Sequence, residues 1–164
     1  MRHMHIDIET FSSVDIKKSG LYKYVQSPDF EILLFAYSID GSPVEIIDLV
    51  SESMPDYIID TLQDPNIIKH AYNAAFEWYC LNKFYRSPLE QWRCTMVHAL
   101  YCGYPAALGQ VNEAMSMPED KKKLSTGQAL IRTFCSSCKP TKRNGKRIRN
   151  LPHHEPEKWE LFKE

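Results

Sequence analysis

The sequence lacks long apolar runs. No stretch of its 164 residues approaches the roughly 18 to 20 consecutive apolar residues of a membrane span. The N-terminal segment MRHMHIDIET also lacks the apolar stretch and the small-residue cleavage site of a secretory signal. We therefore expect a cytoplasmic protein without a membrane partner.

A large net charge and a disulfide pattern are absent as well. The formal net charge is −1, which excludes a broadly polybasic nucleic-acid binder. The five cysteines are an odd number at irregular spacing, so they do not predict a disulfide framework. The sequence contains no internal repeat and no glycine-rich phosphate loop of the GxxxxGK pattern.

The basic charge that is present is concentrated in one segment. Residues 139–149 contain six of the 20 Lys and Arg residues and no acidic residue. The remaining 14 basic and 21 acidic residues give the rest of the chain a net charge of −7. Residues 135–153, here called the basic loop, include this segment with two cysteines, two prolines and a glycine, a composition typical of a surface loop.

The spacing of apolar residues predicts a strand near the start of the chain. From Met4 to Glu9 apolar and polar residues alternate, so Ile6 and Ile8 share one face while Asp7 and Glu9 share the other. Two carboxylates so placed can offer hard oxygen ligands to one Mg²⁺ or Mn²⁺ ion. The same pattern is also typical of an exposed strand face that simply prefers water.

The next segments predict a hairpin, a helix and a further strand. Glu31–Ile39 and Val44–Leu49 are the expected strands of an antiparallel hairpin, because Asp40-Gly41 between them is a strong turn signal. Asp56–Leu62 has helical spacing, and Asn66–His70 predicts a short buried strand. The first half of the chain therefore supplies most of a sheet.

The second half is predicted to be mostly helical. Helices are expected over residues 73–87, 94–102, 108–115, 125–134 and 155–163. We expect the chain to end inside the last helix, where Trp159 and Phe162 form an apolar face that needs a cover, which favours self-association. Together the elements predict one mixed α/β domain over residues 1–164.

The junction between the strand ending at His70 and the following helix carries a third carboxylate. The first helical turn contains Asn73 and Glu77. If this junction lies beside the first strand, Glu77 can face the same metal ion as Asp7 and Glu9. Asn73 is also a favourable helix N-cap, and the two roles are compatible.

These motifs, in this order, resemble one known family. The segment DIET (residues 7–10), then NAAFE (residues 73–77), then WRCTMVHALYCGYP (residues 92–105) resemble the 3′→5′ proofreading exonuclease domain of family A DNA polymerases, most of all the phage-type enzymes. Residues 20–34, 139–152 and 157–164 are similar to the same branch, so the resemblance covers essentially the whole chain. It implies a member of the DEDD exonuclease superfamily, encoded by a phage or prophage and present in the bacterial cytoplasm.

The resemblance implies a fold and an activity. The fold is ribonuclease-H-like, a mixed α/β architecture in which antiparallel strands 1–3 and a parallel strand form one sheet flanked by helices. The activity is the removal of nucleotides from a single-stranded 3′ end of DNA, with Mg²⁺ or Mn²⁺ as one or two bound ions. Catalysis and metal binding fall to Asp7, Glu9 and Glu77, and substrate binding to Thr10, Asn73 and Phe76. Glu77 stands where the family usually has Asp, and its longer side chain can still reach a metal ion.

One departure from the family pattern concerns the third motif, whose Tyr and Asp would lie just beyond Glu164. In a two-metal mechanism the Asp holds one ion and the Tyr orients the attacking water. Tyr22 and Tyr24 are interpreted as packing residues under the hairpin, not as replacements. We therefore expect weak binding of one ion and loss of most of the rate. The alternative is a fragment that binds nucleic acid, or a partner such as the remainder of a polymerase, without turnover.

The basic loop offers two further sites. Lys139, Lys142 and Arg143 are candidates for binding phosphates of single-stranded DNA, although a solvated loop explains the same charges. The second site is a possible zinc site with the ligand types Cys135, Cys138, His153 and His154. A pair of thiols at a helix end is the alternative for the two cysteines.

Overall fold

A five-stranded mixed sheet forms the centre of the computed structural model, which describes residues 2–118 and 125–164. The strands are β1 (Arg2–Phe11), β2 (Glu31–Ile39), β3 (Glu45–Asp48), β4 (Ile67–Ala71) and β5 (Trp92–Cys94). Their order is β3-β2-β1-β4-β5, antiparallel among the first three and parallel from β1 through β4 to β5. This confirms the predicted mixed sheet. The sequence pattern missed β5 because three residues are too few to show a period.

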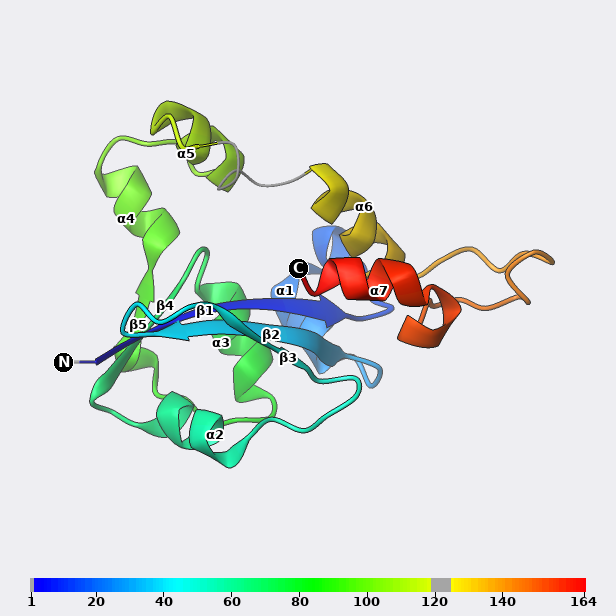
Figure 1. Cartoon of the computed structure of the whole chain (residues 1–164), viewed down its shortest axis with the longest axis horizontal. Helices are drawn as coiled ribbons and strands as arrows, with labels where there is room; N and C mark the ends of the chain where they lie inside the picture. The colour runs from blue at the N-terminus through cyan, green and yellow to red at the C-terminus, as the bar shows by residue number, and fades with distance from the viewer. Residues whose placement is uncertain (1, 119–124) are drawn as a thin grey trace.

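Helices flank the sheet on both faces (Figure 1). They are α1 (Ile16–Gln26), α2 (Asp56–Gln63), α3 (Ala75–Asn82), α4 (Thr95–Tyr101), α5 (Leu108–Ala114), α6 (Ser125–Phe134) and α7 (Pro156–Phe162), with short 3₁₀ turns at Leu89–Gln91 and Pro152–His154. The α1 helix was not predicted, because Gly20, at φ +78°, interrupts its spacing. No helix in the described part of the chain is long and apolar enough to cross a membrane.

Two predicted helix ends are wrong for local reasons. The α3 helix ends at Asn82, several residues before the expected end, because the Asn82 side chain accepts a hydrogen bond from the backbone N–H of Ser87 at 3.0 Å. The α7 helix ends at Phe162, and the N–H of Lys163 donates to the carbonyl of Glu160. The last helix is therefore closed, contrary to the expectation that the chain ends inside it.

The hairpin turn has the conformation that its sequence favours. Asp40 and Gly41 both have positive φ, +52° and +81°, and the N–H of Ser42 donates to the carbonyl of Ile39 at 3.0 Å. A turn with two positive φ values matches the right-handed twist of the flanking strands. It reverses the chain between β2 and β3, which pair from Tyr37 with Glu45 onward.

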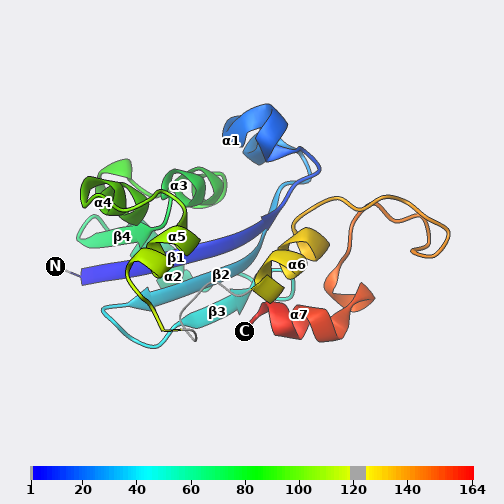
Figure 2. The same cartoon turned by 90° about the horizontal axis from the view of Figure 1, so that it is seen from above.

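Separate apolar clusters cover the two faces of the sheet. Figure 1 shows α2 and α3 on one side and α6 and α7 on the other, and Figure 2 gives the view from above. The larger cluster contains Met4, Ile6 and Ile8 of β1 with residues of α2 and α3. The second cluster consists of Phe11, Leu33, Leu34, Leu130, Phe134 and Trp159, with Cys135 and Phe162 packed against it.

The apolar face of α7 is covered within the chain. Trp159 is only 3% exposed, and its ring meets that of Phe134 edge-on at 4.9 Å between centroids. Phe162 stacks on Phe134 at 5.6 Å. The expectation that these residues need a second copy of the chain as cover is therefore wrong, because α6 supplies the cover.

Candidate active site

The first strand places two carboxylates on one face. Ile6 and Ile8 are buried in the larger cluster, whereas Asp7 is exposed and Glu9 is half-buried on the opposite face. The pairing of β1 with β2 shifts register between Glu9 and Thr10. Such bulges increase the local twist and often lie beside functional sites. The alternation predicted from sequence is confirmed up to this bulge.

A tight junction between β4 and α3 places the third carboxylate. Asn73 has φ +67°, a left-handed conformation that Asn tolerates better than most residues. Its carbonyl accepts from the N–H of Phe76 at 2.9 Å, and its side chain is exposed. The N-cap of α3 is Ala74, without a side-chain bond, so the alternative of Asn73 as the N-cap is wrong.

Glu77, in the first turn of α3, is a buried carboxyl group. The residue is only 3% exposed, and no donor within the described residues reaches its Oε2 atom. Burial, and then the negative charges of Asp7 and Glu9, raise the pKa of Glu77 to about 8. The three side chains predicted as metal ligands therefore influence one another electrostatically. An orphaned carboxylate oxygen near two other carboxylates is a position that a cation stabilises.

The donor atoms suit a hard divalent ion, but they are not already gathered around one point. Carboxylate oxygens are the ligands that Mg²⁺ and Mn²⁺ prefer. In residues 2–118 and 125–164, no group of three or more His, Cys, Asp or Glu side chains is arranged to hold a metal ion. The carboxylates of Asp7, Glu9 and Glu77 thus offer the donor atoms that such an ion prefers, and they lie close enough to affect one another electrostatically. Coordination of one ion by all three requires their side chains to move.

Thr10 does not present its hydroxyl to the surface. It is 4% exposed, and its Oγ1 is 2.8 Å from the hydroxyl of Tyr24 in α1. Burial raises the pKa of Tyr24 to about 12, so its hydroxyl stays protonated. Tyr24 is a packing residue, as predicted, whereas Tyr22 is 66% exposed and the same prediction for it is wrong.

A cavity of about 640 Å³ borders the Glu9 carboxylate between β1, α1 and α6. It is lined by Ile8, Glu9, Thr10, Ser12, Ser13, Val14, Asp15, Ile16, Lys17, Tyr24, Phe76, Gln128, Ile131, Arg132, Cys135, Ser136 and Ser137. Of the residues predicted to bind metal or substrate, the cavity brings together Glu9, Thr10, Phe76 and the zinc candidate Cys135. The sequence pattern gave no sign of Lys17 and Arg132, because their place on the wall depends on how α1 and α6 pack.

Cys135 contacts Glu9 directly. Its Sγ donates to Oε2 of Glu9 at 3.5 Å, although the two residues are 126 positions apart in the chain. Burial, and then the charge of Glu9, raise the pKa of the Cys135 thiol. The available sequence signal was the spacing of Ile131, Phe134 and Cys135, which puts the thiol on the inner face of α6.

The other zinc candidates have different partners. The thiol of Cys138 donates to the carbonyl of Arg147 at 3.4 Å, and Nδ1 of His154 accepts from the N–H of Leu151 at 2.9 Å. His153 and His154 contact one another with ring centroids 4.0 Å apart. The described residues therefore do not bring the two cysteines and two histidines together as a zinc site.

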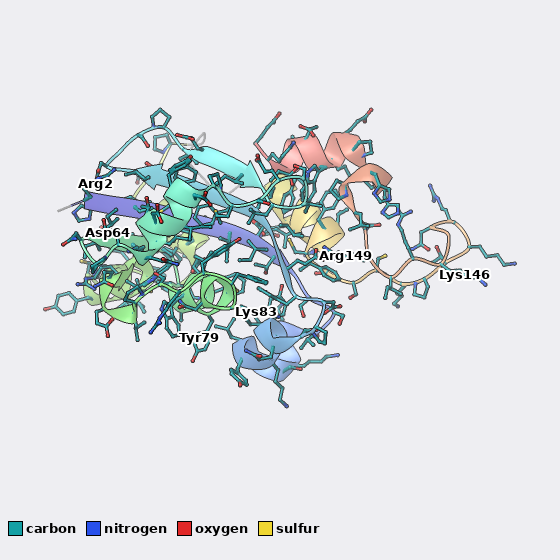
Figure 3. The ribbon with its side chains drawn as sticks, turned by 90° about the horizontal axis from the view of Figure 1, so that it is seen from below. Arg2, Asp64, Tyr79, Lys83, Lys146 and Arg149 are labelled. Carbon is teal, nitrogen blue, oxygen red and sulfur yellow. The ribbon has the colours of Figure 1, made fainter. Side chains whose placement is uncertain are left out.

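The basic loop projects away from the body of the molecule (Figure 1). Lys139, Lys142 and Arg143 are exposed on it, and Figure 3 shows Lys146 far from the sheet and Arg149 close to it. The guanidinium of Arg149 lies 4.0 Å from the centre of the Phe11 ring and pairs with Glu31. Arg149 thus holds the base of the loop, and the role of the three predicted phosphate-binding cations stays a prediction.

Comparison with known proteins gives one relative by sequence. No family model matches the chain. A DNA polymerase of Bacillus phage SP02 is 52% identical over 166 aligned positions, which cover 99% of this chain and 25% of the polymerase. The chain therefore spans about one quarter of the length of this relative.

Solved structures give the fold. Escherichia coli RNase D, an exoribonuclease involved in structured RNA processing, superposes with a TM-score of 0.56 at 16% identity over 77% of this chain and 30% of RNase D. Brucella melitensis NrnC with bound Mg²⁺ superposes with a TM-score of 0.53 at 16% identity over 75% of this chain and 56% of NrnC. The chain is thus similar to one quarter of a phage DNA polymerase, and it has the ribonuclease-H-like fold that these nucleases share.

Proposed function

We propose that this chain is the 3′→5′ exonuclease domain of a phage DNA polymerase, which removes nucleotides from a single-stranded 3′ end of DNA with the help of a divalent cation. The buried carboxyl of Glu77 carries the proposal, because its Oε2 has no donor within reach and Asp7 and Glu9 add negative charge nearby. A carboxyl group in this position destabilises the protein unless a bound cation or a hydrogen-bond donor compensates for its burial. The sequence similarity to a phage polymerase supports the same conclusion.

The ligands would be Asp7 and Glu9 from β1 and Glu77 from α3. A divalent cation supplies a concentrated positive charge that acidifies water and offsets the charge of a phosphodiester. The central strand and the first helical turn fix the backbone positions of the three residues, so that binding an ion requires only their side chains to move. The Mg²⁺ bound in NrnC supports this choice of ion, and Mn²⁺ prefers the same donor atoms.

The cavity beside Glu9 would receive the end of the strand. Phe76 lines this cavity and would stack on a base, and stacking of this kind tolerates every base. Asn73, exposed just before α3, would donate to a backbone oxygen of the substrate. Lys139, Lys142 and Arg143 would contact phosphates farther along the strand.

The partner of the domain would be the remainder of the polymerase, and the complex would work in the bacterial cytoplasm. The relative from phage SP02 carries three further quarters of sequence beyond the part that matches this chain. In a polymerase, a nuclease specific for single-stranded 3′ ends acts as a proofreading activity. The expected substrate is therefore DNA, although the fold also occurs in an exoribonuclease.

A nuclease assay tests the proposal. Single-stranded DNA labelled at its 5′ end is incubated with the chain and Mg²⁺ or Mn²⁺, alongside Asp7→Ala and the control Glu157→Gln, which alters an exposed carboxylate on α7. We expect slow shortening from the 3′ end by the wild type and by the control, and none by Asp7→Ala. Equal rates for the wild type and Asp7→Ala would overturn the proposal, and an RNA strand degraded faster than DNA would overturn its substrate.

The second candidate is binding without turnover. It is favoured by the observation that no three ligand side chains of the described residues are already gathered around one point. Under this alternative single-stranded DNA binds equally well to the wild type and to Asp7→Ala, with or without a divalent ion, and neither protein cleaves it. The same assay, read by gel shift as well as by cleavage, separates the two functions.

A further inference from the structure

The end of α6 is attached to the candidate metal site by a thiol. We infer that Cys135 is a positioning residue, whose Sγ–H holds the Glu9 carboxylate in the orientation that binds a divalent cation. The inference rests on the proposed function, because it assigns Glu9 as a ligand. Under this inference α6 contributes a residue to the candidate metal site, whose proposed ligands lie on β1 and α3.

The thiol is held in place by its surroundings. The N–H of Cys135 donates to the carbonyl of Ile131 at 2.8 Å, so the residue continues the last turn of α6. The preceding residue, Phe134, is 1% exposed and packs edge-on against Trp159 with ring centroids 4.9 Å apart. These two contacts fix the backbone of Cys135 beside β1, at a position from which Sγ reaches Glu9.

The direction of the hydrogen bond follows from the chemistry of the pair. A thiol with an ordinary pKa of about 8.5 keeps its proton at neutral pH, so sulfur is the donor and the carboxylate oxygen is the acceptor. The contact, at 3.5 Å, engages the Oε2 atom of Glu9. Because S–H is a weak donor, it orients the carboxylate without neutralising the charge that a cation needs.

The contact also connects the cavity wall to the metal site. Cys135, Ile131 and Arg132 line the cavity from α6, and Glu9 lines it from β1. A partner of a metal ligand fixes the orientation of that ligand, and removing such a partner typically weakens metal binding by about 10-fold to 100-fold. We expect a loss near the lower bound, because this donor is weak.

The experiment measures Mn²⁺ binding to the whole chain by electron paramagnetic resonance, with four variants. Cys135→Ala and Cys135→Val remove the donor, and the valine also fills the space of the thiol. Cys135→Ser keeps a donor, and Cys138→Ala removes a neighbouring thiol that contacts Arg147 rather than Glu9. We expect Cys135→Ala and Cys135→Val to weaken Mn²⁺ binding by about 10-fold, Cys135→Ser to retain most of the affinity, and Cys138→Ala to match the wild type.

A second set of proteins distinguishes positioning from general stability. In a Glu9→Gln background, Cys135→Ala should cause no further loss of Mn²⁺ affinity, because its effect acts through the Glu9 carboxylate. Equal additional loss in that background, or an unchanged affinity in Cys135→Ala and Cys135→Val, would overturn the inference while leaving the proposed function intact. Absence of Mn²⁺ binding to the wild type would overturn both.

Discussion

Glu77 is the residue whose environment is hardest to explain by folding alone. A buried carboxyl with one oxygen lacking a donor costs free energy, and nearby Asp7 and Glu9 add to that cost. Proteins keep such groups where a ligand later compensates for them, which is why stability and function often oppose each other at a site. We therefore expect that replacing Glu77 increases the stability of the protein but removes its function.

Replacing Glu77 by a similarly shaped apolar residue should reveal this conflict. Without metal ions, Glu77→Met should raise the free energy of unfolding by about 1 to 3 kcal/mol, because it removes an unsatisfied buried polar group. It should also abolish any stabilisation by Mn²⁺. Urea unfolding with EDTA and with excess Mn²⁺ gives both numbers, and a metal-free Glu77→Met protein less stable than the wild type would contradict this reading.

At the scale of elements, α6 and α7 close one face of the sheet through aromatic contacts. Phe134 meets both Trp159 and Phe162, while the indole N–H of Trp159 donates to Asp48 of β3 at 2.8 Å. This packing also sets where Cys135 stands relative to Glu9. The packing of α6 therefore affects both the stability of the protein and the geometry of the candidate site.

Truncating the aromatic anchor of α6 should be severe. Phe134→Ala should lower the free energy of unfolding by about 3 to 5 kcal/mol, the usual range for a fully buried aromatic residue. Leu161→Ala, at a position 47% exposed on α7, is the matched control and should change the free energy of unfolding by no more than about 0.5 kcal/mol. Comparable losses in the two variants would show that α6 does not pack on the sheet as described.

The parallel pairing of β1 with β4 brings three imidazole rings together. His70 lies 2.9 Å from His3 between ring nitrogens and stacks on His5 at 4.8 Å between centroids. Burial, and then the nearby His5, His3, His98 and Arg93, lower the pKa of His70. As the pH falls below about 6.5, the unfolded chain therefore takes up a proton first.

It follows that the free energy of unfolding should decrease as the pH falls from about 6.5 through the folded-state pKa of His70. His70→Gln should flatten this slope, because the substituted residue does not titrate. Urea unfolding between about pH 7.5 and pH 5 measures both proteins in the relevant window. An identical slope in the wild type and in His70→Gln would refute the assignment.

The elements that sequence could predict are those whose burial follows a simple period. The alternation in β1, the hairpin of β2 and β3, and the helix α6 over residues 125–134 were all found. The kinked α1 and the three-residue β5 were missed, since neither has a long enough period. The contact between Cys135 and Glu9 could not be predicted, because it arises from the docking of α6 on the sheet.

At the scale of the whole molecule, charge is divided between an acidic body and a projecting basic loop. The loop carries six basic residues within 139–149, and the remaining chain has a net charge of −7. Figure 1 shows the loop reaching away from the sheet. An acidic body concentrates cations near the carboxylates, whereas the loop offers the opposite charge to phosphates.

This division predicts the salt dependence of single-stranded DNA binding. Replacing Lys139, Lys142 and Arg143 together by Ala should weaken binding and reduce the slope of log affinity against log salt by about 2, at roughly 0.7 per phosphate contact. Lys158→Ala on α7 is the control and should leave the slope unchanged. Fluorescence anisotropy across a salt series gives the slope, and an unaltered slope in the triple variant would show that the loop is merely solvated.

The most direct measurement for the account as a whole is the binding of Mn²⁺ to the wild type, Asp7→Ala, Glu77→Gln and the control Glu157→Gln, followed by electron paramagnetic resonance. If Asp7, Glu9 and Glu77 form the metal site of an exonuclease, the wild type and the control bind Mn²⁺ with the same affinity. Asp7→Ala and Glu77→Gln then bind Mn²⁺ at least about 10-fold more weakly. Equal Mn²⁺ affinity in all four proteins would contradict the account.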